Sequence, residues 1–339
     1  MSVLVSLAAV FVLVIVATIG AGVADLQPIF AIGIPYLAVA IFLAGFIYRM
    51  LKWASVPVPF NITTSCGQQK TLPWIKDSKL ESPSSIFGVI GRMALEVLFF
   101  RSLFRNTTAQ LRRGGPKLIY WDNMLLWAGA MAFHWCFFII VVRHTRFFLA
   151  EKTPFFITLT QNLDGFFQYL SPTVYLSSFV ILGALGYLLL RRLLNPQVRY
   201  ISLLQDYFPL FLLLGIALTG CIMRYLDFRV DVMKVTDLAN GLATFHPPAS
   251  AALPDGQGVG AIFYVHIFLV STLLVYFPFS KLMHMGGVFL SPTRNMISAT
   301  RMFRHVNPWN PKVKVHTYEE YEDEFRDKMK GADIAVEKE

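Results

Sequence analysis

Cysteine and charged residues are both scarce in this sequence. Cys66, Cys136 and Cys221 are its three cysteines among 339 residues, and no two of them are spaced as C-x-x-C or C-x-x-C-H. An iron–sulfur cluster, a structural zinc site, a covalently attached c-type haem and a disulfide framework are therefore not expected within this chain. Charged residues make up 15% of the chain and hydrophobic residues 55%, against about 25% and roughly 45–50% in soluble domains. With a mean hydropathy of +0.54 as well, an ordinary soluble domain is excluded.

Six long stretches contain no Lys, Arg, Asp or Glu. A bilayer core of about 30 Å needs about 20 apolar residues in a helix, and backbone polar groups in hydrocarbon must be satisfied within a helix or a closed barrel. Unbroken apolar runs of this length indicate helices, so we predict an all-α polytopic membrane protein whose six transmembrane helices form a bundle. The predicted spans are 4–22, 29–48, 123–142, 172–190, 207–223 and 259–280.

The first stretch also has features of a secretory signal, because Gly22 and Ala24 place small residues before Asp25. No Lys or Arg precedes it, however, and its apolar run is longer than a typical signal-peptide core. It is therefore predicted to be a membrane span. The short connection 23–28 would join it to the second span as an antiparallel hairpin.

The net charge of +9 comes from an uneven distribution of basic residues. When the spans are threaded through a membrane, the side that carries both termini receives 24 Lys and Arg and the other side receives 6. Cytoplasmic loops are enriched in Lys and Arg, so we predict the cytoplasmic (inner) membrane with both termini in the cytoplasm. Because the basic residues flank spans, the nucleic-acid-binding function that a basic chain otherwise suggests is excluded.

Residues 85–104 form a further apolar stretch, but Arg92 and Glu96 lie near its middle, four residues apart on one helical face. Charges at the centre of a bilayer are costly. We therefore predict an amphipathic helix at the cytoplasmic interface, begun by Ser84 or Ser85.

The expected domain organisation has four parts. Residues 1–52 form a hairpin of spans, and residues 53–120 a cytoplasmic loop with the interfacial helix. Residues 121–290 form a core of four helices, and residues 291–339 a cytoplasmic tail. From Thr317 the tail mixes acids and bases, which predicts a partner-contacting helix or a partly disordered segment.

Four of the seven histidines lie on two predicted spans or just beyond them. His134 and His266 are inside spans, and His144 and His284 follow them along the same two helices. A polar ring within a span usually faces the bundle interior and has a partner there. The remaining three are expected to be solvated: His246, His305 and His316.

The rise per residue of a helix gives the depth of each histidine in the membrane, and the four histidines form two pairs of similar depth. At 1.5 Å per residue, His134 and His144 are about 15 Å apart, and His266 and His284 about 27 Å apart. Because the two spans run in opposite directions, His144 and His266 lie toward the outer side, and the other two toward the inner side. Two such pairs are what two bis-imidazole haems need, and helix tilt or a kink at Pro278 would have to absorb the unequal separations. On the residues alone, haem ligation and satisfied or proton-pathway histidines stay equal alternatives.

Two segments carry a family resemblance: FHWCFFIIVVRHTRFF from Phe133 and FPFSKLMHMGGVFLSPTRN from Phe277. Histidines 10 apart on one helix and 18 apart on a later one resemble the gamma-chain family of respiratory nitrate reductases. More closely, the segments resemble the DsrM family, the membrane cytochromes b of the DsrMKJOP complex in sulfate-reducing prokaryotes. The resemblance covers about residues 120–310. It implies two haem b groups, one held by His144 with His266 and one by His134 with His284.

The resemblance also implies partners. Menaquinone would be the quinone, and a cytoplasmic iron–sulfur subunit resembling heterodisulfide reductase would exchange electrons with the basic surface near His284. A periplasmic multihaem cytochrome c and other membrane subunits would complete a complex for dissimilatory sulfate or sulfite reduction. The scarcity of cysteine agrees with a cluster that lies in another subunit.

Further candidate residues follow His144 on the predicted outer side. Arg143 and Arg146 match carboxylates in a forked geometry and are candidates for holding a haem propionate, with lipid headgroup contact as the alternative. Lys152, Gln161 and Asp164 are candidates for a quinone site, which needs a proton acceptor, with ordinary loop solvation as their alternative.

Two other functions compete with the cytochrome interpretation. A proton-coupled transporter with relay histidines should have internal repeats and acids within its spans, and neither is found. A passive membrane anchor for peripheral subunits predicts that His134 tolerates leucine.

Overall fold

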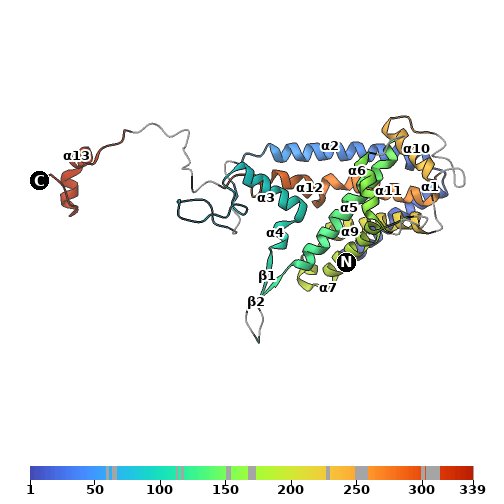
Figure 1. The fold of residues 1–339 in the computed structure, drawn as a ribbon, viewed down its shortest axis with the longest axis horizontal. Coiled ribbons are helices and arrows are strands. Elements are labelled where there is room, and N and C mark those ends of the chain that lie inside the picture. Colours follow the sequence, from blue (N-terminus) through green and yellow to red (C-terminus); the bar gives the residue numbers. More distant parts are fainter. Residues whose placement is uncertain are drawn as a thin grey trace.

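The computed structural model describes residues 1–58, 61–62, 67–111, 114–115, 118–149, 154–166, 173–226, 230–248, 259–298, 302 and 314–338. Six helical segments in it are long and apolar enough to cross a membrane, which confirms the predicted all-α polytopic fold (Figure 1). They are α1 (Ser2–Gly22), the π-helical η1 (Ile29–Gly33) with α2 (Ile34–Ala54), α5 (Met124–His144) with η2 (Thr145–Phe148), α7 (Leu176–Leu194), α9 (Leu204–Tyr225), and α11 (Ala261–Tyr276) with η4 (Phe277–Phe279).

Helix α11 lies at the centre of the bundle. It packs against α1, α2 and α9, whereas α5 lies to one side and packs mainly against α7. Fully buried apolar side chains such as Leu269 on α11 and Leu212 on α9 form the core between these helices. His266 is therefore presented from the most enclosed helix of the bundle, and His134 and His144 from a peripheral one.

The last span ends earlier than predicted. Helix α11 stops at Tyr276, the 3-10 turn η4 follows, and Ser280 is extended with ψ 178°. Pro278 lacks the N–H needed for a helical hydrogen bond, which favours an interruption here. The chain resumes as η5 (Lys281–Met283) and α12 (His284–Gly287). The predicted span 259–280 is therefore not one continuous helix, and the chain is interrupted at Pro278 rather than only kinked there.

The amphipathic stretch around Arg92 forms α3 (Ile86–Phe99), which has 14 residues and is not one of the candidate spans. Ser85 begins it as predicted, because its hydroxyl oxygen accepts a hydrogen bond from the N–H of Gly88. Phe100 ends it in a left-handed conformation with φ 49°, and the short α4 (Arg101–Phe104) follows.

Helix α3 is attached to the end of the bundle at which α5 begins. The indole N–H groups of Trp127 and Trp135 on α5 donate to main-chain oxygens of Phe99 and Leu98, at 2.7 and 3.1 Å. Glu96 of α3 forms an ion pair of 3.1 Å with Arg294, which follows α12 in the chain. Helix α3 therefore contacts both α5 and the segment that follows α12.

Short elements complete the described chain. Two antiparallel strand pairs occur, with Thr107 opposite Asp122 in the first and Gly165 opposite Tyr175 in the second. The first pair was not predicted, although Gly114 and Gly115 mark its turn in the sequence. The remaining elements are β1 (Thr107–Leu111), β2 (Leu118–Asp122), α6 (Phe155–Asp164), β3 (Gly165–Phe166), β4 (Val174–Tyr175), α8 (Pro196–Ile201), α10 (Val232–Ala243), η6 (Val288–Leu290) and α13 (Tyr318–Gly331).

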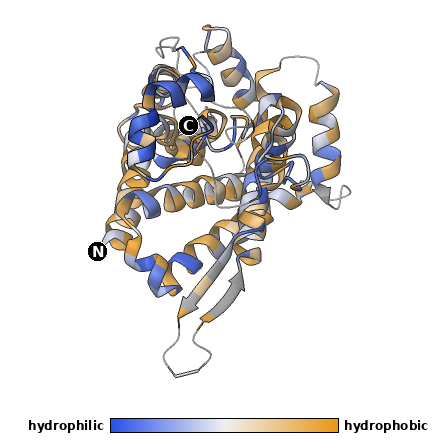
Figure 2. Cartoon of the chain, turned by 90° about the vertical axis from the view of Figure 1, so that its left-hand side faces the viewer, coloured by the Kyte–Doolittle hydropathy of each residue, from blue (hydrophilic) through white to orange (hydrophobic). Residues whose placement is uncertain are grey.

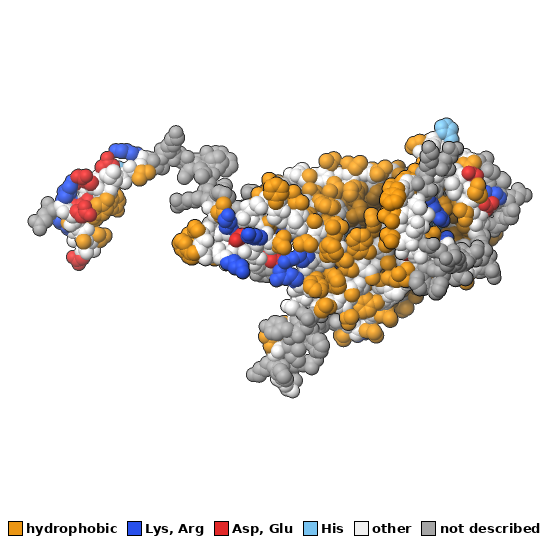
Figure 3. All heavy atoms as spheres, in the orientation of Figure 1, with side chains coloured by type: hydrophobic (Ala, Val, Ile, Leu, Met, Phe, Trp, Pro, Cys, Tyr) orange, Lys and Arg blue, Asp and Glu red, His pale blue; other side chains and the backbone are white. Residues whose placement is uncertain are grey.

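The outside of the bundle is apolar along its middle. Large hydrophobic side chains such as Phe11 and Ile15 of α1 and Leu43 of α2 are about half exposed. Figure 2 shows the same hydrophobic character along the bundle helices, and in Figure 3 hydrophobic side chains cover the middle of the face in view. Basic and acidic side chains gather on that face at the end near α3. A soluble protein would not expose apolar surface of this extent, so the surface fits a lipid environment.

The tail forms the helix α13, and residues 337–338 pack back against it. Thr317 and Glu320 make a capping box at the start of α13. Glu322 is almost completely buried, and its carboxylate accepts hydrogen bonds from the backbone N–H groups of Glu337 and Lys338, at 2.8 and 2.7 Å. The final residues therefore fold back over the helix.

The hydrogen bonds that hold residues 337–338 against α13 are expected to break in acid. The backbone N–H of Glu337 lowers the pKa of Glu322, because it stabilises the charged carboxylate. A carboxyl group with a depressed pKa stabilises the folded state fully above its ordinary value of 4.5, and that contribution is lost as the pH falls through the depressed value. Amide hydrogen exchange should show protection of Glu337 and Lys338 at neutral pH and its loss in acid. Glu322→Gln should already lower the protection at neutral pH; equal protection in both proteins would contradict the prediction.

Candidate functional site

One pair of histidines meets near the end of the bundle that carries α3. His134 in α5 and His284 at the start of α12 have ring centroids 6.0 Å apart and ring planes at 76°. The ring of Phe100 packs edge-on against His134, with centroids 4.9 Å apart. A left-handed backbone is uncommon for a non-glycine residue and costs on the order of 1 kcal/mol. The turn after α3 thus holds a strained residue directly against this pair.

A second pair lies toward the opposite end of the bundle. His144 is the last residue of α5, and its ring is close enough to His266 of α11 for an electrostatic interaction between them. Helix α5 therefore contributes one histidine to each pair. The partners come from α11 and from α12, on the two sides of the break at η4.

Three of these histidines have the same ring tautomer. The Nδ1 atoms of His134, His144 and His284 lie 2.7–2.8 Å from the main-chain oxygens of Ala130, Ile140 and Lys281. A carbonyl oxygen only accepts hydrogen bonds, so each neutral ring donates from Nδ1–H. The lone pair of each ring is then on Nε2, which is the form that binds a metal.

His266 has the same tautomer, but its Nδ1 contacts a side chain of another helix. Its Nδ1 lies 2.8 Å from Oγ1 of Thr219 on α9. The single hydroxyl hydrogen of Thr219 is directed to its own helix, where the oxygens of Gly215 and Ile216 are 2.8 and 3.0 Å away. The hydroxyl oxygen therefore accepts from Nδ1–H of His266, and Nε2 again carries the lone pair.

The His134–His284 pair has a ring separation that fits ligation of haem iron by two imidazoles. With metal–nitrogen bonds of about 2 Å, an iron between two imidazoles places their ring centroids roughly 6 Å apart, as His134 and His284 are. Among the described residues, α5 does not pack closely against α11 or α12, the two helices that carry the partner histidines. In the same residues no group of three or more His, Cys, Asp or Glu side chains could hold a metal ion by itself.

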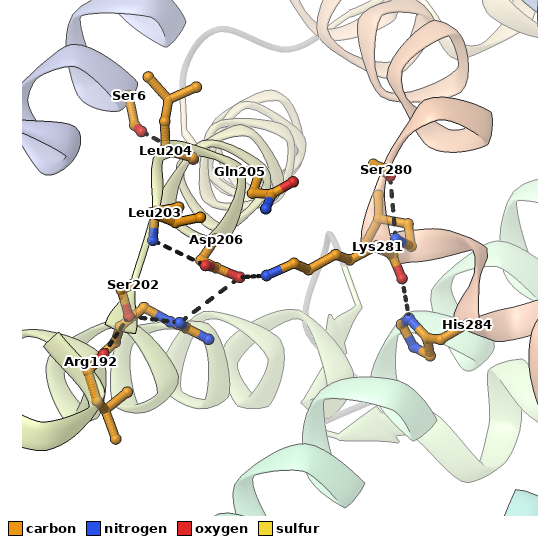
Figure 4. Close-up of polar contacts among 12 residues, drawn as sticks. Ser6, Arg192, Ser202, Leu203, Leu204, Gln205, Asp206, Ser280, Lys281 and His284 are labelled. Atoms are coloured by element: carbon orange, nitrogen blue, oxygen red, sulfur yellow. Dashed lines mark hydrogen bonds and ion pairs between the residues drawn. The ribbon is translucent and has the colours of Figure 1, made fainter. Parts of the chain in front are cut away.

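Lys281 connects His284 to the rest of the bundle (Figure 4). Its carbonyl oxygen accepts Nδ1–H of His284, and its Nζ lies 2.7 Å from Oδ1 of Asp206. Asp206, in the first turn of α9, also accepts from the N–H of Leu203 and lies 4.0 Å from a guanidinium nitrogen of Arg192. The turn that presents His284 is therefore attached to both α9 and α7.

A buried ion pair lies near the His144–His266 pair. Nη1 of Arg143 is 2.7 Å from Oδ2 of Asp164, and both side chains are less than a tenth exposed. Ser177 donates to the same carboxylate from its backbone N–H and its hydroxyl, each at 2.7 Å. Two residues that the sequence suggested for separate roles are thus in direct contact.

Three arginines gather around one buried tyrosine. The guanidinium carbons of Arg143 and Arg224 are 3.8 and 4.3 Å from the centre of the Tyr175 ring, and Arg146 is close enough to Tyr175 for an electrostatic interaction. The charges of Arg143 and Arg146 also act on His144. Nε of Arg143 is buried and has no hydrogen-bond partner among the described residues. With Asp164 as the neighbouring acid, this group of residues keeps a positive surplus that suits an anionic ligand.

The other predicted residues are placed as follows. Gln161 lies in α6, three residues before Asp164, and Lys152 lies outside the described residues. The sequence reasoning missed Thr219 and Arg224. Thr219 is a polar residue within an apolar span, which is the signal that could have identified it.

Fold and site together define a polytopic helical membrane protein with paired histidines at two levels of the bundle. The family model for the nitrate reductase gamma subunit matches residues 84–305, and the chain belongs to this family. The chain is 44% identical over 286 residues to an Hdr-like menaquinol oxidoreductase cytochrome b-like subunit of Archaeoglobus fulgidus, with 84% of each chain covered. A protein of the same description from Archaeoglobus profundus is 37% identical over 282 residues, with 82% of each covered. The respiratory nitrate reductase 1 gamma chain of Escherichia coli is 37% identical over 106 residues, which are 30% of this chain and 45% of that one.

Proposed function

We propose that this chain is a dihaem cytochrome b that carries electrons between menaquinol and a cytoplasmic iron–sulfur subunit. The observation that carries the proposal is the presence of two histidine pairs with Nδ1 engaged and Nε2 available in all four rings. The names of the two Archaeoglobus relatives include both a cytochrome b and menaquinol. An electron-transfer subunit linked to a quinone accounts for all of these findings together.

The four histidines would hold two haems. His144 and His266 would hold one of them, and His134 and His284 the other. Haem iron supplies one-electron ferric–ferrous chemistry when it is bound. The protein's part is to fix the imidazole rings through their Nδ1–H groups and to exclude water with apolar neighbours such as Phe100.

The arginines near His144 would bind the propionates of the haem at that level. Arg143, Arg146 and Arg224 bring three positive charges and Asp164 one negative charge, which leaves a surplus that two propionates would neutralise. The partnerless Nε of Arg143 supports this role, since a buried donor without an acceptor is costly.

The quinone site is proposed at the same end, which would face outward. A quinol that gives up electrons also releases protons, and an acceptor must be near. Asp164 and Lys152 are the proposed contacts. Asp164 would act together with Arg143, its partner in the ion pair.

The opposite end, with His284 and α3, would face the cytoplasm. The excess of Lys and Arg on that side supports this orientation, and the exposed Lys281 beside His284 suits an acidic docking partner. More specifically, the chain would be a DsrM-type subunit of a complex for sulfate or sulfite reduction. Its neighbours would be a heterodisulfide-reductase-like iron–sulfur subunit, a periplasmic multihaem cytochrome c and further membrane subunits.

The purified full chain tests this proposal directly. Reduced-minus-oxidised spectra should show the α band of haem b, and haem extraction should give two non-covalent haems per chain. The nearly perpendicular rings of His134 and His284 should also give a strongly anisotropic low-spin ferric EPR signal, because such planes leave the iron dπ orbitals close in energy. A folded chain without haem b would refute the cytochrome function and leave a transporter or an anchor.

A further inference from the structure

We propose that Thr219 is a positioning residue whose hydroxyl sets the ring orientation of His266 and the reduction potential of the haem held by His144 and His266. This inference rests on the proposed function, because it concerns a ligand of that haem. It adds a residue on α9, a helix that provides no haem ligand itself.

The direction of the hydrogen bonds around Thr219 carries the argument. The hydroxyl has one hydrogen, which the oxygens of Gly215 and Ile216 attract from within the same helix. A hydroxyl that already donates becomes a stronger acceptor, since linked hydrogen bonds polarise one another. Nδ1–H of His266 is thus held by an activated acceptor at 2.8 Å.

His266 differs from the other three histidines in where its acceptor lies. His134, His144 and His284 donate to main-chain oxygens three or four residues before them. Those contacts follow from the local backbone and no substitution removes them. His266 instead contacts the Oγ1 of Thr219, 47 residues away on a packed neighbouring helix, and the main-chain oxygen of Ile216 on that helix also acts on the ring. The Thr219 hydroxyl can be removed without changing α11.

The hydrogen bond should affect the metal through the ligand. An Nδ1–H that donates to a strong acceptor gives the imidazole more anionic character and makes Nε2 a better donor to iron. Stronger donation stabilises the ferric state and lowers the reduction potential. Loss of the acceptor should therefore raise the potential of this haem alone.

Three variants of the full chain test the proposal. Thr219→Val keeps the shape of the side chain and removes the hydroxyl, whereas Thr219→Ser keeps the hydroxyl. Thr272→Val is the matched control, because Thr272 on α11 makes the same kind of bond to its own helix, with the Phe268 oxygen at 2.9 Å. Potentiometric titration followed by haem absorption, with EPR of the oxidised protein, gives readouts that do not depend on turnover.

We expect Thr219→Val to raise the midpoint potential and shift the EPR signal of one haem, while the other haem keeps its values. Loss of that one haem from Thr219→Val would also support the proposal, provided that Thr219→Ser retains it. Thr219→Ser and Thr272→Val should match the wild type. Should Thr219→Val fail to assemble, the smaller Thr219→Ala is measured in the same way.

Two results would overturn different statements. If the wild-type chain binds two haems and Thr219→Val has wild-type potentials and spectra, the role of Thr219 is refuted and the cytochrome function stands. If the wild-type chain binds no haem, the proposed function itself fails.

Discussion

Replacement of His284 by leucine is expected to remove one of the two haems and to leave the other reducible. His284 and His134 face each other across 6.0 Å, so His134→Leu should lose the same haem and give the same spectrum. Without the haem on the α3 side, a quinol analogue should still reduce the remaining haem, but electrons should no longer reach a partner at that end. Haem extraction, difference spectra and quinol-dependent reduction measure these effects.

The complementary variants should show the reverse pattern. His144→Leu and His266→Leu should both lose the other haem, and reduction by the quinol analogue should be abolished in both. His246→Leu is the control, since that ring is exposed and its Nδ1 lies 2.7 Å from the main-chain oxygen of Thr244, two residues before it. If His134→Leu and His284→Leu lost different haems, the proposed pairing would be contradicted.

Asp164→Asn is expected to destabilise the folded protein strongly. The substitution keeps the size of the side chain and one oxygen that can accept from the Ser177 backbone N–H, but it replaces the other carboxylate oxygen by an NH2 group and removes the charge that compensates the buried Arg143. Breaking a buried ion pair on one side typically costs about 3–5 kcal/mol. Thermal unfolding in detergent, followed by circular dichroism, should show a clearly lower midpoint temperature.

Two further variants separate the ion pair from general effects of substitution. Asp323→Asn removes an acid that is half exposed in the tail helix and should change the midpoint little. The double variant Arg143→Met with Asp164→Leu removes both charges and should recover part of the lost stability, because an unpaired buried charge no longer remains. If Asp164→Asn unfolded at the wild-type temperature, the ion pair would not contribute to stability.

Much of the bundle follows from local properties of the sequence. Hydropathy and the absence of charge locate the six spans, since each depends on a single stretch of chain and on the thickness of a bilayer. Arg92 and Glu96 similarly separate α3 from the spans, because a charge in the bilayer centre is costly wherever the helix packs. The depth of each histidine along its helix follows from the rise per residue.

Features that depend on how helices rotate against one another did not follow from the sequence. The contact between Arg143 and Asp164 requires α6 to fold back against α5, and the bond from His266 to Thr219 requires one rotation of α11 relative to α9. Both are tertiary contacts for which spacing gives no rule. The break at Pro278 was expected only as a kink, because a proline alone does not determine whether a helix bends or ends.

The continuity of α5 and the interruption after α11 give the two halves of the site different tolerance to changes in length. One inserted residue between His134 and His144 would turn the later ring by about 100° around the helix axis, away from its partner, so this interval of sequence has a fixed length. An insertion within Phe277–Ser280 falls outside regular α-helix and would leave the orientation of His266 unchanged. Among homologous sequences, gaps should therefore be confined to the second interval.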